Sequence, residues 1–425
     1  MQKLQVWDRR LACLAIGVPV AAAAVLLAPR ATSAAEGYFL PAAEVESRYN
    51  DNWRLRPDGQ EQISAIGTFL DLHAQFGLRS PRSDISIIPR LTSSFFADSE
   101  DDDRLSSDDQ FLNLSAYREM EKARWAITAG YANESVLTAE ISDVEFDDPT
   151  EDVGDTGIVN VRNDRERITA RPTWLYNYSE QTQFGLGYSF VDVAYDDEIL
   201  TRQTDFTDHE VDANLSRQLT ERTLLTTRVF GSRFEADQID NQTDSVGIDF
   251  EFNRRLTERM RGSFIVGAQR VEADYIDPVT GLPTSESKTN TLFGLGLRTD
   301  LTEATSWNAT LSRDVNPNGT GFVVQNDQLL VAVDHAFGPR LRGRLGTRLL
   351  RSEGVGDNEN IQFTDRDYAR IEGGLRWALT ETWSLIGGYS YTRQEFDRGI
   401  DEGDASSNAV SLAIAYQARS RFRGR

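Results

Sequence analysis

The chain of 425 residues is poor in the side chains on which most catalytic and metal sites depend, with one cysteine and three histidines. The cysteine, Cys13, lies in an apolar N-terminal stretch, so the rest of the chain has no disulfide, zinc–thiolate site or cysteine nucleophile. The histidines, His73, His209 and His335, are far apart, and none lies beside a serine in a nucleophile motif. Glycine-rich phosphate loops and metal-ligand spacings are also missing. The sequence therefore predicts neither an enzyme nor a cofactor nor a metal site.

Long hydrophobic runs are absent after the N-terminal region, because no later segment is apolar for the roughly 18 residues that a membrane-spanning helix needs. The one apolar run, Leu11–Leu27, follows three basic residues and precedes Ser33-Ala34-Ala35. A basic start, an apolar middle and small residues before a cleavage point are typical of a secretory signal peptide. We predict a signal peptide at 1–35 and a single domain at 36–425; a membrane anchor is the alternative for the apolar run.

Positive charge is also scarce, with 45 basic against 67 acidic residues and a net charge of −22. This balance argues against nucleic acid as a partner, because lysine and arginine must neutralise its phosphates. The mean hydropathy of −0.46 is low for a helical membrane protein, but it suits a membrane barrel, in which only alternate residues are apolar. The 21 Phe, 13 Tyr and 7 Trp argue against a disordered acidic chain.

What the sequence does contain is a recurring Leu-Thr-Glu turn between segments of alternating apolar and polar residues. The turn occurs at 219–221, 256–258, 301–303 and 379–381, with degenerate copies at Met120-Glu121, Tyr178-Ser179-Glu180 and Phe337-Gly338-Pro339. Successive turns are 36 to 59 residues apart. The pattern of each unit predicts a strand, a tight turn, a second strand and a longer polar loop. A repeat of this kind predicts an up-and-down β-barrel.

The alternation within each segment indicates the environment of the barrel wall. In residues 183–190 the apolar set is Phe184, Leu186, Tyr188 and Phe190, and the opposite set is Gln183, Gly185, Gly187 and Ser189. Because a strand has a period of two, the sets lie on opposite faces. A soluble β-sandwich gives the same pattern. The number of strands, the aromatic residues near strand ends and the signal peptide favour a barrel in the outer membrane of a Gram-negative bacterium.

The alternating segments number eighteen, although sixteen is an alternative because strand limits read from sequence are uncertain. The predicted strands are 42–50, 61–79, 83–97, 108–119, 122–134, 164–178, 181–195, 206–218, 222–236, 243–256, 259–274, 287–300, 304–315, 322–336, 340–353, 363–378, 382–397 and 406–418. An even number places both ends of the barrel domain on the periplasmic side. A barrel of this size is wide enough for an aqueous channel.

The short Leu-Thr-Glu turns are expected to be periplasmic and the longer connections extracellular. The longest connection, 135–163, is either an extracellular lid or a loop folded into the lumen, since loops of this length are usually functional or disordered. Its many acidic residues are most simply solvated. The acidic cluster at 98–103 lacks the spacing of an EF-hand, so no calcium site is predicted.

Charged residues on the inner face are the candidate site. The predicted lumen-lining residues are Arg298, Arg342, Arg344, Arg348, Arg370, Arg376, Asp249 and Glu251, with Arg90, Arg167, Arg171, Asp71, Asp212 and Glu372 beside them. Three arginines in 341–348 share one face of one strand. Guanidinium groups bind carboxylates and phosphates, which points to an anionic permeant. The alternative is that these arginines pair with wall carboxylates and stiffen the barrel.

A resemblance extends over most of residues 40–418. The segments Tyr49-Asn50-Asp51-Asn52, Pro81-Arg82-Ser83 and Ser189 to Tyr195, followed by Asp205-Phe206-Thr207-Asp208, resemble the outer-membrane β-barrel porins found with bacterial exopolysaccharide loci. The resemblance implies an outer-membrane barrel that assists polysaccharide secretion, and it brings no catalytic residues. The C-terminus departs from the usual pattern, because the chain continues past Tyr416 to Arg425 instead of ending on an aromatic residue.

We therefore expect a passive outer-membrane channel that assists export of an exopolysaccharide. The alternatives are a general small-solute porin and a plugged structural or adhesion barrel whose acidic loops bind a partner. The expected partners are outer-membrane lipid and lipopolysaccharide, an exopolysaccharide and periplasmic export components. A lumen that conducts ions would distinguish the first two functions from the third.

Overall fold

The structure is a computed structural model that describes residues 35–96, 105–141, 156–159, 162–196, 203–276, 281–355, 365–396 and 403–418. Within these residues lie eighteen strands, the short α-helix α3 (Val136–Ile141) and the 3-10 turn η2 (Asp237–Ile239). The strands are β1 (Glu36–Asn50), β2 (Ala65–Ser80), β3 (Ser83–Phe96), β4 (Asp108–Glu119), β5 (Ala123–Ser135), β6 (Asp164–Ser179), β7 (Thr182–Tyr195), β8 (Phe206–Thr220), β9 (Thr223–Ala236), β10 (Asn241–Arg255), β11 (Met260–Ile276), β12 (Pro283–Asp300), β13 (Thr305–Pro317), β14 (Val323–Ala336), β15 (Leu341–Gly354), β16 (Arg366–Ala378), β17 (Trp383–Phe396) and β18 (Gly403–Gln417).

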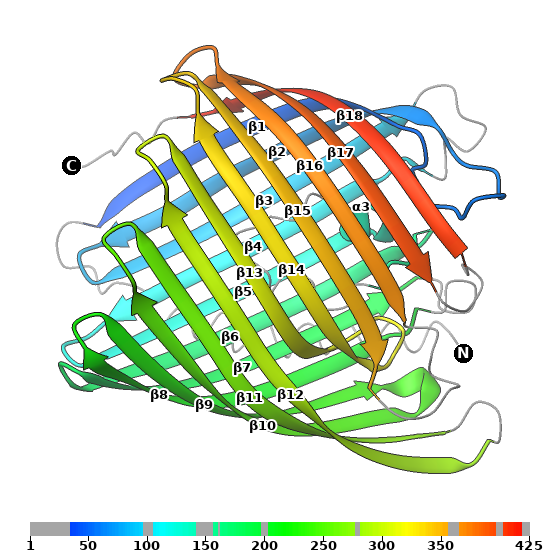
Figure 1. Ribbon diagram of the computed structural model, residues 1–425. Coiled ribbons are helices and arrows are strands. Elements are labelled where there is room, and N and C mark those ends of the chain that lie inside the picture. The colour runs from blue at the N-terminus through cyan, green and yellow to red at the C-terminus, as the bar shows by residue number, and fades with distance from the viewer. Residues whose placement is uncertain are drawn as a thin grey trace.

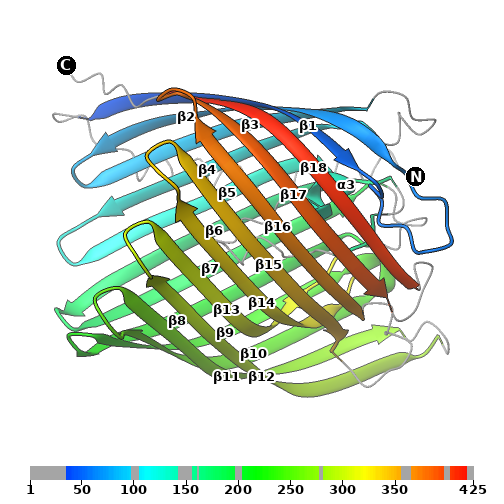
Figure 2. The same cartoon turned by 45° about the horizontal axis from the view of Figure 1, so that its top comes forward.

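The strands form one closed sheet. Each strand is antiparallel to the next along the chain, and β1 also pairs with β18, from Ala42 opposite Gln417 to Asn50 opposite Ala409. Figures 1 and 2 show the resulting barrel, with tilted strands around a central space. Closure leaves no sheet edge with unpaired backbone groups, which is what a β-structure needs in lipid. The predicted all-β, up-and-down barrel of about eighteen strands is confirmed.

Most predicted strand limits agree with the structure to within a few residues, and the first strand differs most. It begins at Glu36 and not near residue 42, because β1 continues to pair with β2 as far as Glu36 opposite Arg79. Similarly, β12 begins at Pro283 because it pairs with β11 up to Ile276. The alternation of apolar residues ends before these extensions, so only the pairing partner reveals them.

The two faces of the wall have opposite character. In β10, Val246, Ile248 and Phe250 are 57%, 40% and 38% exposed, whereas Asp249 between them is only 6% exposed. This is the reverse of a soluble protein, in which large apolar side chains are buried. The same outward apolar band runs around the barrel, for example at Leu295 and Leu345. An apolar outer band on a closed barrel is the surface that lipid covers, and the protein is an outer-membrane barrel.

The Leu-Thr-Glu repeat has a structural explanation at the short-turn rim, which lies on the left in Figure 1. In each copy the threonine hydroxyl accepts a hydrogen bond from the backbone N–H two residues later, at distances of 3.1–3.2 Å. The threonines are Thr220, Thr257, Thr302 and Thr380. A hydroxyl that binds its own turn in this way stabilises the reversal of the chain. The repeat therefore marks the tight turns, which are periplasmic in barrels of this kind.

The inner face is less uniformly polar than the sequence pattern suggests. At the long-loop end, the inward side chains of Val191, Val193, Phe206 and Phe234 are buried together with Val136 of α3. Residues of the opposite parity on the same strands, such as Phe190 and Val211, lie on the outer face. The buried strand residues therefore face the interior. They are apolar because loops fold back into the barrel and pack on them.

The predicted signal peptide lies outside the described residues and remains a prediction. No helix among the described residues is long and apolar enough to cross a membrane.

Candidate functional site: the barrel lumen

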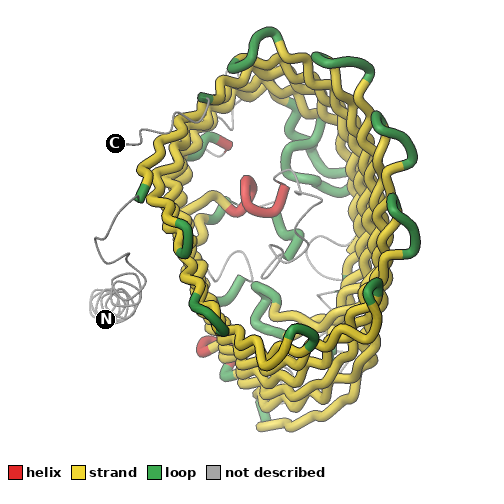
Figure 3. Tube along the Cα trace, turned by 90° about the vertical axis from the view of Figure 1, so that its left-hand side faces the viewer, coloured by secondary structure: helices red, strands yellow, loops and turns green. Residues whose placement is uncertain are grey.

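The long connection after β5 enters the barrel. Figure 3 shows α3 inside the ring of strands and away from the wall. Val136 and Leu137 are buried, and Leu137 belongs to an apolar cluster with Trp53 and Val159. Of the two alternatives for this connection, the described parts agree with a loop folded into the lumen; residues 142–155 lie outside the described residues.

Glu140 of α3 ties the two described parts of this loop together. Its carboxylate accepts hydrogen bonds from the Thr156 backbone N–H at 3.0 Å, from the Thr156 hydroxyl at 2.6 Å and from the Gly157 N–H. Thr156 and Gly157 are buried. Burial raises the pKa of the Glu140 carboxyl above its usual range, and the Arg366 charge partly opposes this rise. Glu140 is therefore a structural anchor, although the sequence suggested only a solvated acid.

The segment 156–159 reaches a part of the wall well away from β5. Gln394 of β17 donates a hydrogen bond to the Gly157 carbonyl at 3.0 Å, and Arg54 donates one to the Val159 carbonyl at 2.7 Å. Five strands separate β17 from β5 around the ring, so the loop crosses the interior. Gly157 has a φ of 74°, and a Cβ there would clash with the guanidinium group of Arg366. The positive φ favours glycine at this point.

Other long loops also bend inward and join this constriction. The Thr204 N–H donates to the Gly319 carbonyl at 2.8 Å, and the Asn241 side chain donates to the Gly321 carbonyl at 2.6 Å. Arg54 and Asn52, from the loop between β1 and β2, are almost fully buried. The described loops thus narrow the lumen at its extracellular end.

We expect Glu140→Ala to widen the channel. The substitution leaves three hydrogen-bond donors without their acceptor, and each unmet buried donor costs about 1–3 kcal/mol. The inward position of segment 156–159 loses stability, while the barrel wall is unchanged. Single-channel conductance in planar bilayers should rise and become noisier. Glu166→Ala, which removes an exposed acid from the outer face of β6, should leave conductance at the wild-type value; an E140A conductance equal to wild type would contradict the anchoring role.

The predicted basic residues of β15 and β16 lie on the inner face. Arg342 pairs in register with Arg376, and Arg348 pairs with Arg370. These residues face away from the exposed Leu345 and Leu375 on the same strands. Arg344 of β15 and Arg366 of β16 lie on the same face. Arg366 was not named from the sequence, although its position has the same parity. We call these six arginines the basic strip. The basic strip consists of Arg342, Arg344 and Arg348 of β15 and Arg366, Arg370 and Arg376 of β16.

The alternative that these arginines pair with wall carboxylates applies to some of them. Arg370 is buried and forms an ion pair with Glu372 at 3.1 Å. Arg342 and Arg376 are exposed to the lumen at the periplasmic end, and neither forms an ion pair with another described residue. Arg298 behaves in the same way: it lies opposite Arg261 of β11, and both are exposed without an ionic partner in the described part of the chain.

Acidic residues gather on a different part of the wall. We call Asp208, Glu210 and Asp212 of β8 and Asp249 and Glu251 of β10 the acidic strip. Within it, Arg228 of β9 binds Asp249 at 2.8 Å and approaches Glu210 at 3.6 Å. Asp249, Glu251 and Asp212 were predicted, whereas Asp208, Glu210 and Arg228 were missed although the same parity identifies them. Four strands separate β10 from β15, so the lumen has a basic side and an acidic side.

The remaining predicted inward residues are found elsewhere on the inner face. Asp71 of β2 binds both Arg90 of β3 and the His73 ring. Arg167 and Arg171 of β6 face inward opposite Val193 and Thr128. His209 contacts Tyr188 and His335 contacts Thr305, so the three histidines have separate partners. No group of three metal-binding side chains occurs among the described residues.

Comparisons with known proteins add little beyond the fold. No protein-family model matches the chain, and no curated protein matches it in sequence. Similar solved structures include the ferric citrate transporter FecA (TM-score 0.48, 9% identity, covering 91% of this chain and 80% of that chain). Others are the copper transporter OprC (0.47, 13%, 89% and 65%) and OccK2 (OpdF) of Pseudomonas aeruginosa (0.47, 11%, 90% and 98%). At these identities the similarity concerns the barrel fold alone, which the strand pairing already establishes.

Proposed function

We propose that this barrel is an outer-membrane channel through which acidic saccharide chains are exported along the basic strip. The observation that carries the proposal is the length of that strip. Arg376 lies near the periplasmic turn and Arg366 near the extracellular end, ten residues apart on β16. At roughly 3.3 Å per residue this is about 33 Å along the tilted strand, comparable with the roughly 25 Å apolar band of such barrels. Arg348, Arg366 and Arg370 are buried, so a chain with repeated negative charges would contact Arg342, Arg344 and Arg376 at the periplasmic end of the strip at once.

The periplasmic entrance supports capture of anions from the inside. Arg261 lies directly opposite Arg298, and Arg342 lies directly opposite Arg376. Like charges in directly opposite positions destabilise a sheet, and none of these four arginines has an ionic partner among the described residues. A bound carboxylate or phosphate would relieve both repulsions, since a guanidinium binds either group with two hydrogen bonds.

A recess beside the strip favours a saccharide over a simple anion. It is a shallow recess of about 10 Å³, room for one water molecule, between β1 and the strands β16 to β18, so a saccharide would contact its rim from the lumen and not enter it. Its lining residues are mostly small and polar: Arg48, Asn50, Asn52, Leu55, Arg370, Ser390, Thr392, Ser407 and Ala409. Hydroxyl and amide groups donate and accept hydrogen bonds with sugar hydroxyls, whereas Arg48 and Arg370 are already paired with Glu46 and Glu372.

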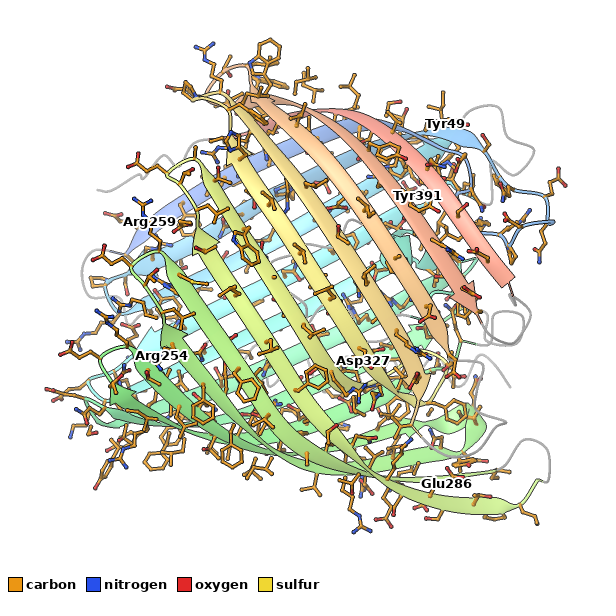
Figure 4. All side chains as sticks on the ribbon, viewed as in Figure 1. Tyr49, Arg254, Arg259, Glu286, Asp327 and Tyr391 are labelled. Carbon is orange, nitrogen blue, oxygen red and sulfur yellow. The ribbon has the colours of Figure 1, made fainter. Side chains whose placement is uncertain are left out.

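The test is block of ionic current in a planar bilayer by an oligogalacturonate, compared with a neutral malto-oligosaccharide of equal length. We expect the acidic oligosaccharide to interrupt the current at lower concentration, and more effectively from the periplasmic side. Arg342→Ser with Arg376→Ser should abolish this preference. The matched control is Arg254→Ser, because Arg254 lies at the same end of the barrel on the outer face (Figure 4). Equal block by both oligosaccharides, or acidic block that survives the double substitution, would refute the proposal.

A channel for small anions is the second candidate, and the inward loops favour it. Segment 156–159 and α3 occupy part of the lumen and reduce the width left for a polymer. In the same bilayer experiment, anion-selective current that neither oligosaccharide interrupts would support this candidate. Absence of current under all conditions would instead support a closed structural or adhesion barrel.

A further inference from the structure

Four arginines recur at one position of the repeat, and a fifth lies two residues before that position. Arg233, Arg270, Arg351 and Arg393 follow the third residue of their turns, residues 221, 258, 339 and 381, by twelve residues, and Arg313 follows Glu303 by ten. They lie on β9, β11, β13, β15 and β17, which are alternate strands of the wall. We call Arg233, Arg270, Arg313, Arg351 and Arg393 the arginine belt. The equivalent positions of β5 and β7 hold Asn133 and Asp192, so the belt covers one side of the barrel.

The belt faces outward at the extracellular edge of the apolar band. Arg351 and Arg313 follow the outward, exposed Leu349 and Leu311 by two residues, and therefore share their face. Arg393 follows Tyr391 in the same way. In Figure 4, Asp327, the partner of Arg313, lies toward the end of the barrel opposite to the periplasmic Arg259. None of these arginines lines the lumen, so the belt is separate from the proposed transport path.

Carboxylates on neighbouring strands hold most of these guanidinium groups. Arg233 binds Asp244 at 2.8 and 3.2 Å, and Arg393 binds Asp404 at 2.9 and 2.6 Å. Arg313 binds Asp327 at 2.5 Å through two nitrogens. Arg351 binds Glu353 at 2.8 Å, and Arg270 is exposed with no ionic partner in the described chain.

These ion pairs orient the arginines without exhausting their donors. A guanidinium has five N–H groups, and a two-point contact with a carboxylate uses two of them. The side chains of Arg233 and Arg393 are about half exposed, so their other donors are open to a further ligand. Half-exposed ion pairs contribute only about 0–1 kcal/mol to stability, so stability alone gives little reason for an arginine at this level on five alternate strands.

We propose that the arginine belt binds the phosphate groups of outer-leaflet lipopolysaccharide. Phosphate headgroups lie at the level where the apolar band ends, and arginine matches phosphate with paired hydrogen bonds. The low dielectric of the adjacent acyl chains strengthens such contacts relative to water. The aspartates act as positioning residues that hold the guanidinium groups at the interface. Lipopolysaccharide phosphates are then bound along the side of the barrel from β9 to β18, while the opposite side lacks the belt.

The experiment measures retention of bisphosphorylated lipid A by the full barrel in detergent, with native mass spectrometry and the unfolding temperature as readouts. Wild-type protein should bind this lipid and unfold at a higher temperature when it is added, whereas dephosphorylated lipid A and inorganic phosphate should have little effect. Arg313→Gln with Arg351→Gln and Arg393→Gln should weaken lipid A binding by roughly tenfold for each arginine–phosphate interaction that the substitutions remove.

Two control variants separate lipid binding from the ion pairs. Asp327→Asn with Glu353→Gln and Asp404→Asn breaks the same three pairs but keeps the arginines, so lipid A binding should fall by less than in the arginine variant. Arg254→Gln with Arg259→Gln removes two arginines from the periplasmic end and should leave binding unchanged. Undiminished binding by the arginine variant, a loss in the carboxylate variant equal to that in the arginine variant, or equal stabilisation by free phosphate would each overturn the proposal. Because the belt lies outside the lumen, none of these outcomes bears on transport.

Discussion

Replacing Arg342, Arg344 and Arg348 with serine should lower the preference of the channel for anions over cations by about tenfold at low salt. Clustered positive groups in a narrow lumen with low-dielectric walls concentrate anions by focusing the local field. The measurement is the reversal potential across a planar bilayer under a potassium chloride gradient. The double variant R342S/R344S, which keeps the buried Arg348, should change selectivity in the same direction by less.

Salt provides the internal control for this prediction. At 1 M the screening length falls to about 3 Å, so wild type and variant should then have the same selectivity. Arg351→Ser changes the same strand on its outer face and should leave selectivity unaltered. If the triple variant keeps wild-type selectivity at low salt, the arginines are neutralised within the wall, as Arg370 is by Glu372, and their role is structural.

An arginine placed on the outer face of the wall should destabilise the barrel far more than one placed on the inner face. Leu311 of β13 is exposed to lipid in the middle of the strand, opposite the outward Leu295, and Ser312 beside it faces the lumen opposite Gly294. We expect Leu311→Arg to lower the free energy of unfolding by about 1–2 kcal/mol, between the penalty for a cation at the bilayer midplane and that at the interface, because Arg313 at the edge of the apolar band is two residues away.

Ser312→Arg is the matched control for Leu311→Arg, because Ser312 is the next residue of the same strand and faces the lumen. The measurement is the urea midpoint of unfolding from lipid vesicles, with the slope checked for constancy. Equal destabilisation by the two substitutions would contradict the assignment of the faces.

The sequence by itself predicted the strands, their faces and their number. Each strand crosses between lipid and lumen, so alternate residues report two different solvents, as Ile248 and Asp249 do. The threonine of each Leu-Thr-Glu turn forms its hydrogen bond within the turn itself, and so a purely local signal marks these periplasmic reversals. These two signals need no knowledge of distant contacts, which explains why they located β10 at Asn241–Arg255 against a predicted 243–256.

The same parity identified the charged inner face but not the contacts made there. The alternation placed both Arg342 and Arg376 on the inner face of their strands. That they lie directly opposite one another follows only from the register of β15 and β16. Only the folded wall likewise shows that Arg370 has Glu372 as its partner while Arg342 has none among the described residues. Pairing between strands depends on the whole ring, so it decides which arginines are available to an anion.

The tertiary structure alone decided how the loops narrow the lumen. Glu140 resembles any other acid of an acidic loop in the sequence, yet it accepts hydrogen bonds from Thr156 and Gly157. Gln394 reaches the Gly157 carbonyl across 237 positions of the chain, and Arg54 reaches Val159 across 105. Irregular backbone inside a barrel must find hydrogen-bond partners wherever the opposite wall supplies them. No local pattern encodes that choice, because the partners become neighbours only when the barrel closes.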